Sequence, residues 1–230
     1  MPASGPGSLS ARLVEDHREL LDRACTARFM TEVRDGTLAT STFRSYLAIE
    51  RHFVVESARM LAAAALRSQD ETALVGHLDA AHDLVHGQLD YFSETLARVG
   101  DPGPLSGPAL ERAGGLAELA RRVVASGDYW RLIVLSFTTE HLYLTWCRAT
   151  LPHVDPGTEA GRWVAMHTTT AFADRVHHLA GEVDRATPPD RADEAGQLYR
   201  AVLEAELTFH EAPYLEATVA ADDAKGTPDE

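Results

Sequence analysis

Hydrophobic residues recur along this chain three or four positions apart, which is the spacing of an α-helix. No segment alternates between apolar and polar residues for long enough to predict a strand. The pattern therefore predicts an all-α protein, a single-domain helical bundle of about seven to eight helices over residues 9–220. Helices are expected at about 10–35, 42–68, 70–99, 108–126, 129–151, 158–185 and 191–219.

Glycine, proline and short polar residues mark the ends of these helices. Turns are expected at residues 35–36, 100–104, 155–157 and 188–189. Gly114 and Gly115 are expected to interrupt or divide their helix, and Pro213 to kink or end the last one. Residues 1–8 and 221–230 are interpreted as disordered ends. The helix over 129–151 is apolar nearly all round, which predicts a central position and a wall of any pocket.

Two glutamates stand on the apolar stripes of predicted helices. Glu50 lies between Tyr46 and Phe53, and Glu206 lies between Val202 and Phe209. An unpaired carboxylate in a core costs several kcal/mol or stays protonated. One such acid can be structural, hydrogen-bonded to Tyr or His. Two on distant segments favour a pair in one pocket, with separated pKa values that suit general acid and base catalysis.

Polar residues also interrupt two other predicted helices. His167, Thr170, Asp174 and His177 have offsets of 0, 3, 7 and 10, so they are expected on one helix face. In the central helix, Thr139, Glu140 and His141 stand in an apolar sequence, with Tyr143 one turn beyond Thr139. These residues could line a pocket or form a buried hydrogen-bond network between packed helices. Most of His77, His82 and His86 are expected to face solvent.

Charge and cysteine content restrict the possible partners and location. The chain has 35 acidic and 21 basic residues, and its net charge of −14 argues against non-specific binding to nucleic acid or to an anionic membrane. No apolar run has the length of a membrane span, and the N-terminus lacks a signal-peptide pattern. Cys25 and Cys147 have no metal or disulfide spacing and are interpreted as core residues. An unprocessed cytoplasmic protein is expected.

Four segments of the sequence resemble those of one protein family. They are FMTEVRDGTL at 29–38, FRSYLAIERHF at 43–53, Asp-Pro-Gly at 155–157 and Glu-Leu-Thr-Phe at 206–209. The second resembles F-x-x-Y-L-x-Q-D-x-x-Y and the last resembles E-x-x-F, both patterns of the TenA family, also called thiaminase II or aminopyrimidine aminohydrolase. The resemblance covers most of the chain and implies an all-α heme-oxygenase-like fold, often assembled as a homo-oligomer, a dimer or a tetramer.

The resemblance also implies a pocket for a 4-aminopyrimidine with a reactive methylene. Glu50 matches the acid that holds the ring's amino group, and Glu206 matches the glutamate that handles protons. Phe209 and Tyr143 match a pocket Phe and a pocket Tyr.

Several pocket positions depart from the family. Thr139 stands where the family has its nucleophilic cysteine, and a hydroxyl without an activating base is a far poorer nucleophile. Phe53 and His167 each stand where the family has a Tyr, and no aromatic residue stands near Gly115, where the stacking Tyr aligns. Glu50 is one methylene longer than the family's aspartate, which moves the carboxylate by roughly 1.5 Å. The pocket is therefore expected to be divergent.

The leading hypothesis is a hydrolase that needs no cofactor and cleaves a C–N bond at the methylene of an aminopyrimidine or related heteroaromatic, as in thiamin salvage. Glu206 would protonate the leaving amine, and Glu50 would bind the ring or deprotonate the attacking water. The residues expected to bind this substrate are Thr139, Tyr143, His167, Phe209, Phe53 and Glu140.

Two alternatives belong to other classes. The same fold hosts non-heme di-iron oxygenases, and a partial ligand set is present in Asp79, His86, Glu140, Asp174 and His177. Thr170 stands where the sixth ligand is expected and cannot replace a histidine. The other alternative is a TenA homologue that binds a small molecule without catalysis.

Overall fold

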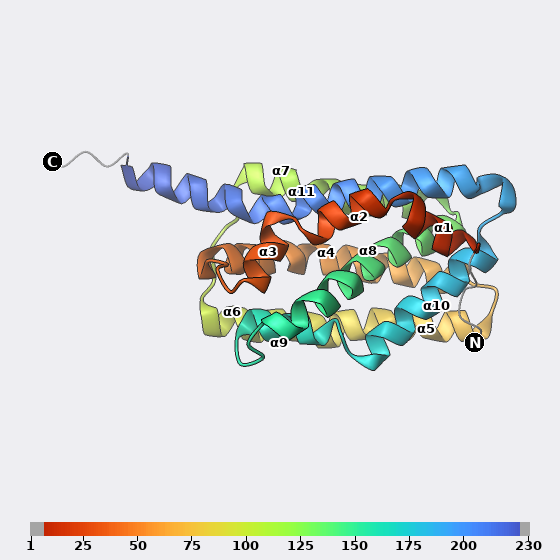
Figure 1. Cartoon of the computed structure of the whole chain (residues 1–230), viewed down its shortest axis with the longest axis horizontal. Coiled ribbons are helices and arrows are strands. Elements are labelled where there is room, and N and C mark those ends of the chain that lie inside the picture. Colours follow the sequence, from red (N-terminus) through yellow and green to blue (C-terminus); the bar gives the residue numbers. More distant parts are fainter. Residues whose placement is uncertain (1–6, 226–230) are drawn as a thin grey trace.

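The computed structural model describes the backbone of residues 7–225 and the side chains of residues 7–215. Within this range the regular elements are all helical, so the predicted all-α class is confirmed. The helices lie along the long axis of the molecule (Figure 1). Residues 1–6 and 226–230, which are parts of the two predicted disordered ends, lie outside the described range.

The described range contains eleven α-helices, more than the seven to eight predicted. A π-helical turn, Asp83–Gln88, joins α5 to α6, and 3-10 turns follow α8 and precede α11. The α-helices are α1 Leu9–Asp16, α2 Arg18–Cys25, α3 Arg28–Arg34, α4 Thr40–Arg67, α5 Glu71–His82, α6 Leu89–Val99, α7 Gly107–Ser126, α8 Tyr129–Thr150, α9 Glu159–Met166, α10 Thr170–Ala186 and α11 Ala192–Lys225.

Helices α4 and α8 form the middle of the bundle. Figure 1 shows them between α7 and α11 on one side and α5, α6 and α9 on the other. Helix α4 packs against α5, α7 and α11, and α8 packs against α10 and α11. The predicted central helix is confirmed as α8, where Leu132, Ile133, Val134 and Leu135 are all buried.

Side chains, rather than glycine or proline, divide the helix predicted over 10–35. His17 Nδ1 donates to the Leu13 carbonyl at 2.9 Å, where α1 ends. The Thr26 hydroxyl donates to the Asp22 carbonyl at 2.7 Å, where α2 ends. These bonds satisfy carbonyls that a helix C-terminus leaves unpaired, so three short helices replace one long helix.

The helix predicted over 158–185 is divided in the same way. His167 Nδ1 donates to the Trp163 carbonyl at 2.9 Å, and the Thr169 hydroxyl accepts from the Phe172 N–H at 3.2 Å. The first bond ends α9 and the second begins α10. His167 therefore does not share a helix with Thr170, and the predicted single face from residue 167 to residue 177 is wrong.

Two sites of predicted interruption lie within continuous helices. Helix α7 runs through Gly114 and Gly115, whose missing side chains would meet open space. Packing of α7 against α4 and α11 outweighs the low helix propensity of these glycines. Helix α11 contains Pro213 and continues to Lys225, so the helix does not end at Pro213 and extends into the segment predicted as a tail.

Among the described residues, no helix is both long and apolar enough to cross a membrane.

Candidate active site

A cavity of about 600 Å³ lies between α4, α8, α10 and the segment formed by α5 and the π turn. This volume is within the range of small-molecule sites. Phe209, one of the residues predicted to bind substrate, is not part of the lining and packs behind Phe53 with ring centroids 5.6 Å apart. The other residues predicted to contact the ligand all line the cavity: Glu50, Phe53, Thr139, Glu140, Tyr143 and His167.

Glu50 and Glu206 come together at the buried end of this cavity, from α4 and α11. Their exposed fractions are 5% and 1%. Glu50 lines the cavity, whereas Glu206 lies next to Thr139 and is not part of the lining. Thr139 does line the cavity, so it lies nearer to the space for a ligand than Glu206 does.

The surroundings of the two glutamates shift both pKa values upward. Burial raises the pKa of Glu50 to about 7, against the lowering effect of the Tyr46 and Tyr143 hydroxyls. Burial, and then the charge of Glu50, raise the pKa of Glu206 well above its ordinary value, while the Thr139 hydroxyl lowers it. Glu50 can therefore titrate near neutral pH, and Glu206 retains its proton to a higher pH than an ordinary glutamate does.

Both acids retain hydrogen-bonding capacity. Among the described residues, Glu50 Oε2 and both carboxyl oxygens of Glu206 have no hydrogen-bond partner. The Thr139 hydroxyl approaches Glu206 but does not complete a hydrogen bond with it. Buried polar atoms without partners are costly, and they are typical of sites where a ligand supplies the missing bonds.

Two tyrosines and a histidine surround the acid pair. The Tyr46 and Tyr143 hydroxyls are 3.2 Å apart, and the Tyr143 hydroxyl is 3.3 Å from His210 Nε2. His210 Nδ1 donates to the Glu206 carbonyl at 2.8 Å, and burial lowers the pKa of His210 to about 4. His210 Nε2 is therefore an acceptor, and the single proton of the Tyr143 hydroxyl can be donated either to it or to Glu50.

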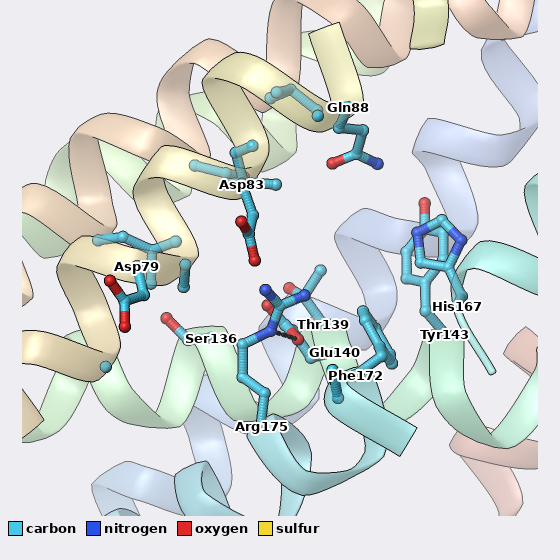
Figure 2. A pocket seen from close by; sticks show the side chains of 18 of the residues that line it. Asp79, Asp83, Gln88, Ser136, Thr139, Glu140, Tyr143, His167, Phe172 and Arg175 are labelled. Carbon is cyan, nitrogen blue, oxygen red and sulfur yellow. Dashed lines mark hydrogen bonds and ion pairs between the residues drawn. The ribbon is translucent and has the colours of Figure 1, made fainter. Parts of the chain in front are cut away.

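His167 stands beside Tyr143 on the cavity wall, with ring centroids 5.3 Å apart (Figure 2). Burial lowers its pKa to about 4, although the Trp163 carbonyl that accepts from Nδ1 opposes the shift. The ring is therefore neutral at pH 7, and its Nε2 is available to accept a hydrogen bond from a ligand.

Glu140 is committed to an ion pair at the same cavity. Its Oε2 accepts from Arg175 Nε at 2.8 Å, and the Arg175 guanidinium lies 4.9 Å from the centroid of the Phe172 ring. Burial raises the pKa of Glu140, and the charge of Arg175 opposes this. Figure 2 shows the pair across the cavity from Asp83. Glu140 therefore holds Arg175 in place, a role that the sequence did not reveal.

The residues proposed as di-iron ligands are spread over different surfaces. Asp79 and Asp174 line the cavity, but His86 and His177 are exposed and are not part of its lining. Asp79 is in α5, whereas His86 lies within the π turn, which changes its orientation relative to Asp79. Within residues 7–215, no three His, Cys, Asp or Glu side chains are grouped so that they could hold a metal ion. This donor set does not fit a di-iron centre.

Sequence reasoning missed three residues near the acids: Tyr46, His210 and Arg175. In the sequence Tyr46 is typical of an apolar stripe residue, but Tyr46 and Glu50 are four residues apart, as are Glu206 and His210. This spacing places each pair on one helix face and is the signal that could have found them. His82 and His86 are exposed, as expected for most of the three histidines, and His77 is the exception, because it is 2% exposed and its Nε2 lies 3.0 Å from the Tyr129 hydroxyl.

Residues 15–102 match the model of the TENA/THI-4/PQQC family. No curated protein matches the chain significantly. A TenA homologue from Pyrococcus furiosus has 15% identity and a TM-score of 0.80, and the match covers 90% of this chain and 100% of that one. The chain has a TenA-type fold. The resemblance to TenA proteins predicted from the sequence is thereby confirmed.

Two further solved structures extend this comparison. A protein from Silicibacter sp. described as a TenA family transcription regulator has 16% identity, 90% and 96% coverage and a TM-score of 0.78. A domain of unknown function with a heme-oxygenase-like fold, from Shewanella denitrificans, has 17% identity, 96% coverage of both chains and a TM-score of 0.64. The predicted heme-oxygenase-like fold is confirmed. Helix α7, which contains Gly115, contributes no residue to the lining of the cavity.

Proposed function

We propose that this TenA-type protein is a hydrolase that replaces the amine of a heteroarylmethyl amine, such as an aminomethyl-aminopyrimidine, with a hydroxyl group. The observation that supports this most strongly is the Glu50–Glu206 pair, because two adjacent buried acids there have differently raised pKa values. Such a pair can supply a base and an acid at the same pH. The resemblance to aminopyrimidine aminohydrolases supports the same substrate class.

The proposed reaction uses one water and releases one amine. Ionised Glu50 removes a proton from the water, whose oxygen bonds to the methylene carbon while the C–N bond breaks and its electron pair goes to nitrogen. Glu206 supplies the proton for the leaving amine through the Thr139 hydroxyl, which lies between Glu206 and the cavity. Proton transfer from Glu50 to Glu206 restores the starting state. Thr139 forms no bond to carbon, in agreement with its weak nucleophilicity.

The remaining lining residues position the ring in this proposal. Phe53, backed by Phe209, offers an apolar face, and His167 Nε2 and the Tyr143 hydroxyl offer hydrogen bonds to ring substituents. A ring amino group would donate to the unpartnered oxygen of Glu50. These contacts would hold the methylene near the attacking water.

The decisive experiment is incubation of chelator-treated protein with an aminomethyl-aminopyrimidine, followed by mass spectrometry of the hydroxymethyl product. We expect turnover by the native protein and a loss of about 10²-fold or more in Glu206→Gln, which keeps the shape and neutrality of the side chain but removes its acidic proton. Equal turnover by both proteins would contradict the role of Glu206. Ligand binding without turnover would instead identify a non-catalytic binding protein.

A further inference from the structure

The mouth of the cavity is lined differently from the end that holds Glu50 and Glu206. Asp79 and Asp83, from α5 and the π turn, lie on one side, and Asp174 and Arg175, from α10, lie on the other. Figure 2 shows the Asp83 carboxylate projecting toward the space above Arg175. The mouth therefore combines three aspartates with one arginine.

The arginine does not balance these aspartates. Arg175 is paired with Glu140 at 2.8 Å, so its charge is already compensated. Asp79 and Asp174 form no ion pair with any described residue, and the nearest basic group to Asp83 is the exposed His82, at 3.8 Å. A surface with this excess of carboxylates attracts cations and repels anions.

A buried hydroxyl in the same region indicates a missing ligand contact. Ser136, on α8, is 2% exposed, lines the cavity, and has a hydroxyl without a hydrogen-bond partner in the described part of the chain. Figure 2 shows this hydroxyl projecting from α8 toward the side of the cavity formed by α5. Leaving such a group unpaired is unfavourable, and a donor from a ligand would remove that cost.

The π turn contributes to the geometry of this region. It contributes Asp83, Leu84, Gly87 and Gln88 to the lining of the cavity. The carboxylates on one side and the Ser136 hydroxyl on α8 thus face one space.

We propose that the mouth is a subsite for an aliphatic ammonium group, carried on the amine side of the ligand. The ammonium donates to the Ser136 hydroxyl and to the carboxylates of Asp79 and Asp83. This inference rests on the proposed function, because it places the heteroaromatic ring at the Glu50–Glu206 end. A cavity of about 600 Å³ has room for both groups. Hydrolysis would then release a diamine instead of ammonia, with the same use of one water.

The test compares two ligands that share the aminomethyl-aminopyrimidine ring and differ only in the arm on the amine nitrogen. One arm ends in an aliphatic ammonium group and the other in a hydroxyl group of equal length. We expect titration calorimetry at low salt to give a dissociation constant about threefold to tenfold lower for the ammonium arm, as exposed ion pairs allow. This preference should decrease as salt is added.

Substitutions at the cavity mouth test whether its residues cause the preference for the ammonium arm. The double variant Asp79→Asn/Asp83→Asn should bind both arms equally, and Ser136→Ala should bind the ammonium arm more weakly than the native protein does. Asp90→Asn is the matched control, because Asp90 is exposed on α6 and lies outside the cavity lining. It should retain the full preference.

The outcomes separate this subsite from the proposed function. Equal binding of the two arms by the native protein, or a preference that survives in the double variant, would overturn the subsite alone. A preference for the ammonium arm without any hydrolysis would support the subsite and refute the hydrolase. Failure of both ligands to bind would overturn the subsite together with the placement of the ring.

Discussion

At the scale of single residues, Glu50 and Glu206 have the same side chain but different surroundings. Burial raises the pKa of Glu50 to about 7, and the hydroxyls of Tyr46 and Tyr143 lower it in part. The carboxyl oxygens of Glu206, in contrast, have no hydrogen-bond partner among the described residues. Burial dominates at both positions. Glu50 can therefore titrate near neutrality, while the charge of Glu50 adds to the effect of burial in raising the pKa of Glu206; a difference of this kind suits acid and base roles.

The raised pKa of Glu50 predicts how its replacement affects stability. The folded protein binds the Glu50 proton more tightly than the unfolded chain does, so this residue lowers stability as pH rises from 4.5 through 7. Glu50→Gln removes that dependence, and above pH 7 its free energy of unfolding should exceed that of the native protein by up to about 3 kcal/mol. Urea unfolding at pH 5 and pH 8 measures this difference.

The matched control is Glu118→Gln, an exposed glutamate whose partner is Arg122. It should change the free energy of unfolding by less than about 1 kcal/mol at both pH values. A Glu50→Gln variant that is less stable than the native protein at pH 8 would show that Glu50 is ionised and well paired in the folded state, contrary to this account.

A second prediction for a single residue concerns Tyr143 and the pH dependence of activity. Its hydroxyl lowers the pKa of Glu50, so Tyr143→Phe should raise that pKa and move the acidic limb of the rate profile to higher pH. Stability should also fall by roughly 1–3 kcal/mol, because His210 Nε2 and the Tyr46 hydroxyl lose a buried partner. Rates measured from pH 5 to pH 9 test the shift, and an unchanged acidic limb would exclude this coupling.

The sequence predicted the acids of the site better than their partners. A carboxylate on an apolar stripe is anomalous by itself, so Glu50 and Glu206 could be identified without the structure. Tyr46 is amphipathic, and on the same stripe it is equally typical of a core residue. His210 and Arg175 act through the tertiary contacts of their helices, which a hydrophobic pattern does not specify.

At the scale of helices, the existence of the segments was predicted well and their internal breaks were not. Helix α8 has the predicted bounds within one residue, because its apolar run is long and bordered by clear turn residues. The breaks at His17 and His167 depend on a histidine that bonds a carbonyl four residues earlier. Histidine is also acceptable inside a helix, so sequence alone does not distinguish the two uses.

Gly161 provides a prediction about the start of α9. A Cβ there would lie 2.0 Å from the Asp155 carbonyl oxygen, so Gly161→Ala must displace the turn over 155–158. We expect a loss of about 1–3 kcal/mol in the free energy of unfolding. Gly115→Ala is the paired variant, because its Cβ meets nothing within 4 Å in α7, and it should stabilise by about 0.5–1 kcal/mol.

Denaturant unfolding of both glycine variants measures these changes. Equal stability of Gly161→Ala and the native protein would mean that the close approach to Asp155 is relieved without cost. Destabilisation by Gly115→Ala would mean that this position of α7 is not open to solvent.

At the scale of the whole molecule, buried histidines and buried glutamates make stability depend on pH in opposite directions. His141, His167 and His210 have pKa values lowered to about 4 by burial, so the folded state loses stability as pH falls from 6.5 toward 4. Glu50 and Glu206 have raised pKa values, so stability is lost as pH rises above 4.5. We expect a maximum of stability near about pH 6, where the two slopes cancel.

Thermal or urea unfolding from pH 4 to pH 9 locates this maximum. The double variant His167→Gln/His210→Gln should unfold with a weaker dependence on pH below 6.5, since two of the buried histidines that take up protons on unfolding are removed. A stability that rises steadily up to pH 9 would contradict the raised pKa values of the acids.

The π turn between α5 and α6 has a consequence for how such a protein changes over time. An extra residue in a helix changes the direction of the side chains that follow it, and this turn lies beside the cavity mouth, on the side away from α8 and α10. Insertions or deletions here therefore alter which side chains meet a ligand without changing the residues of α8 and α10 that line the opposite wall. It is a position at which descendants of one ancestor can acquire different substrates.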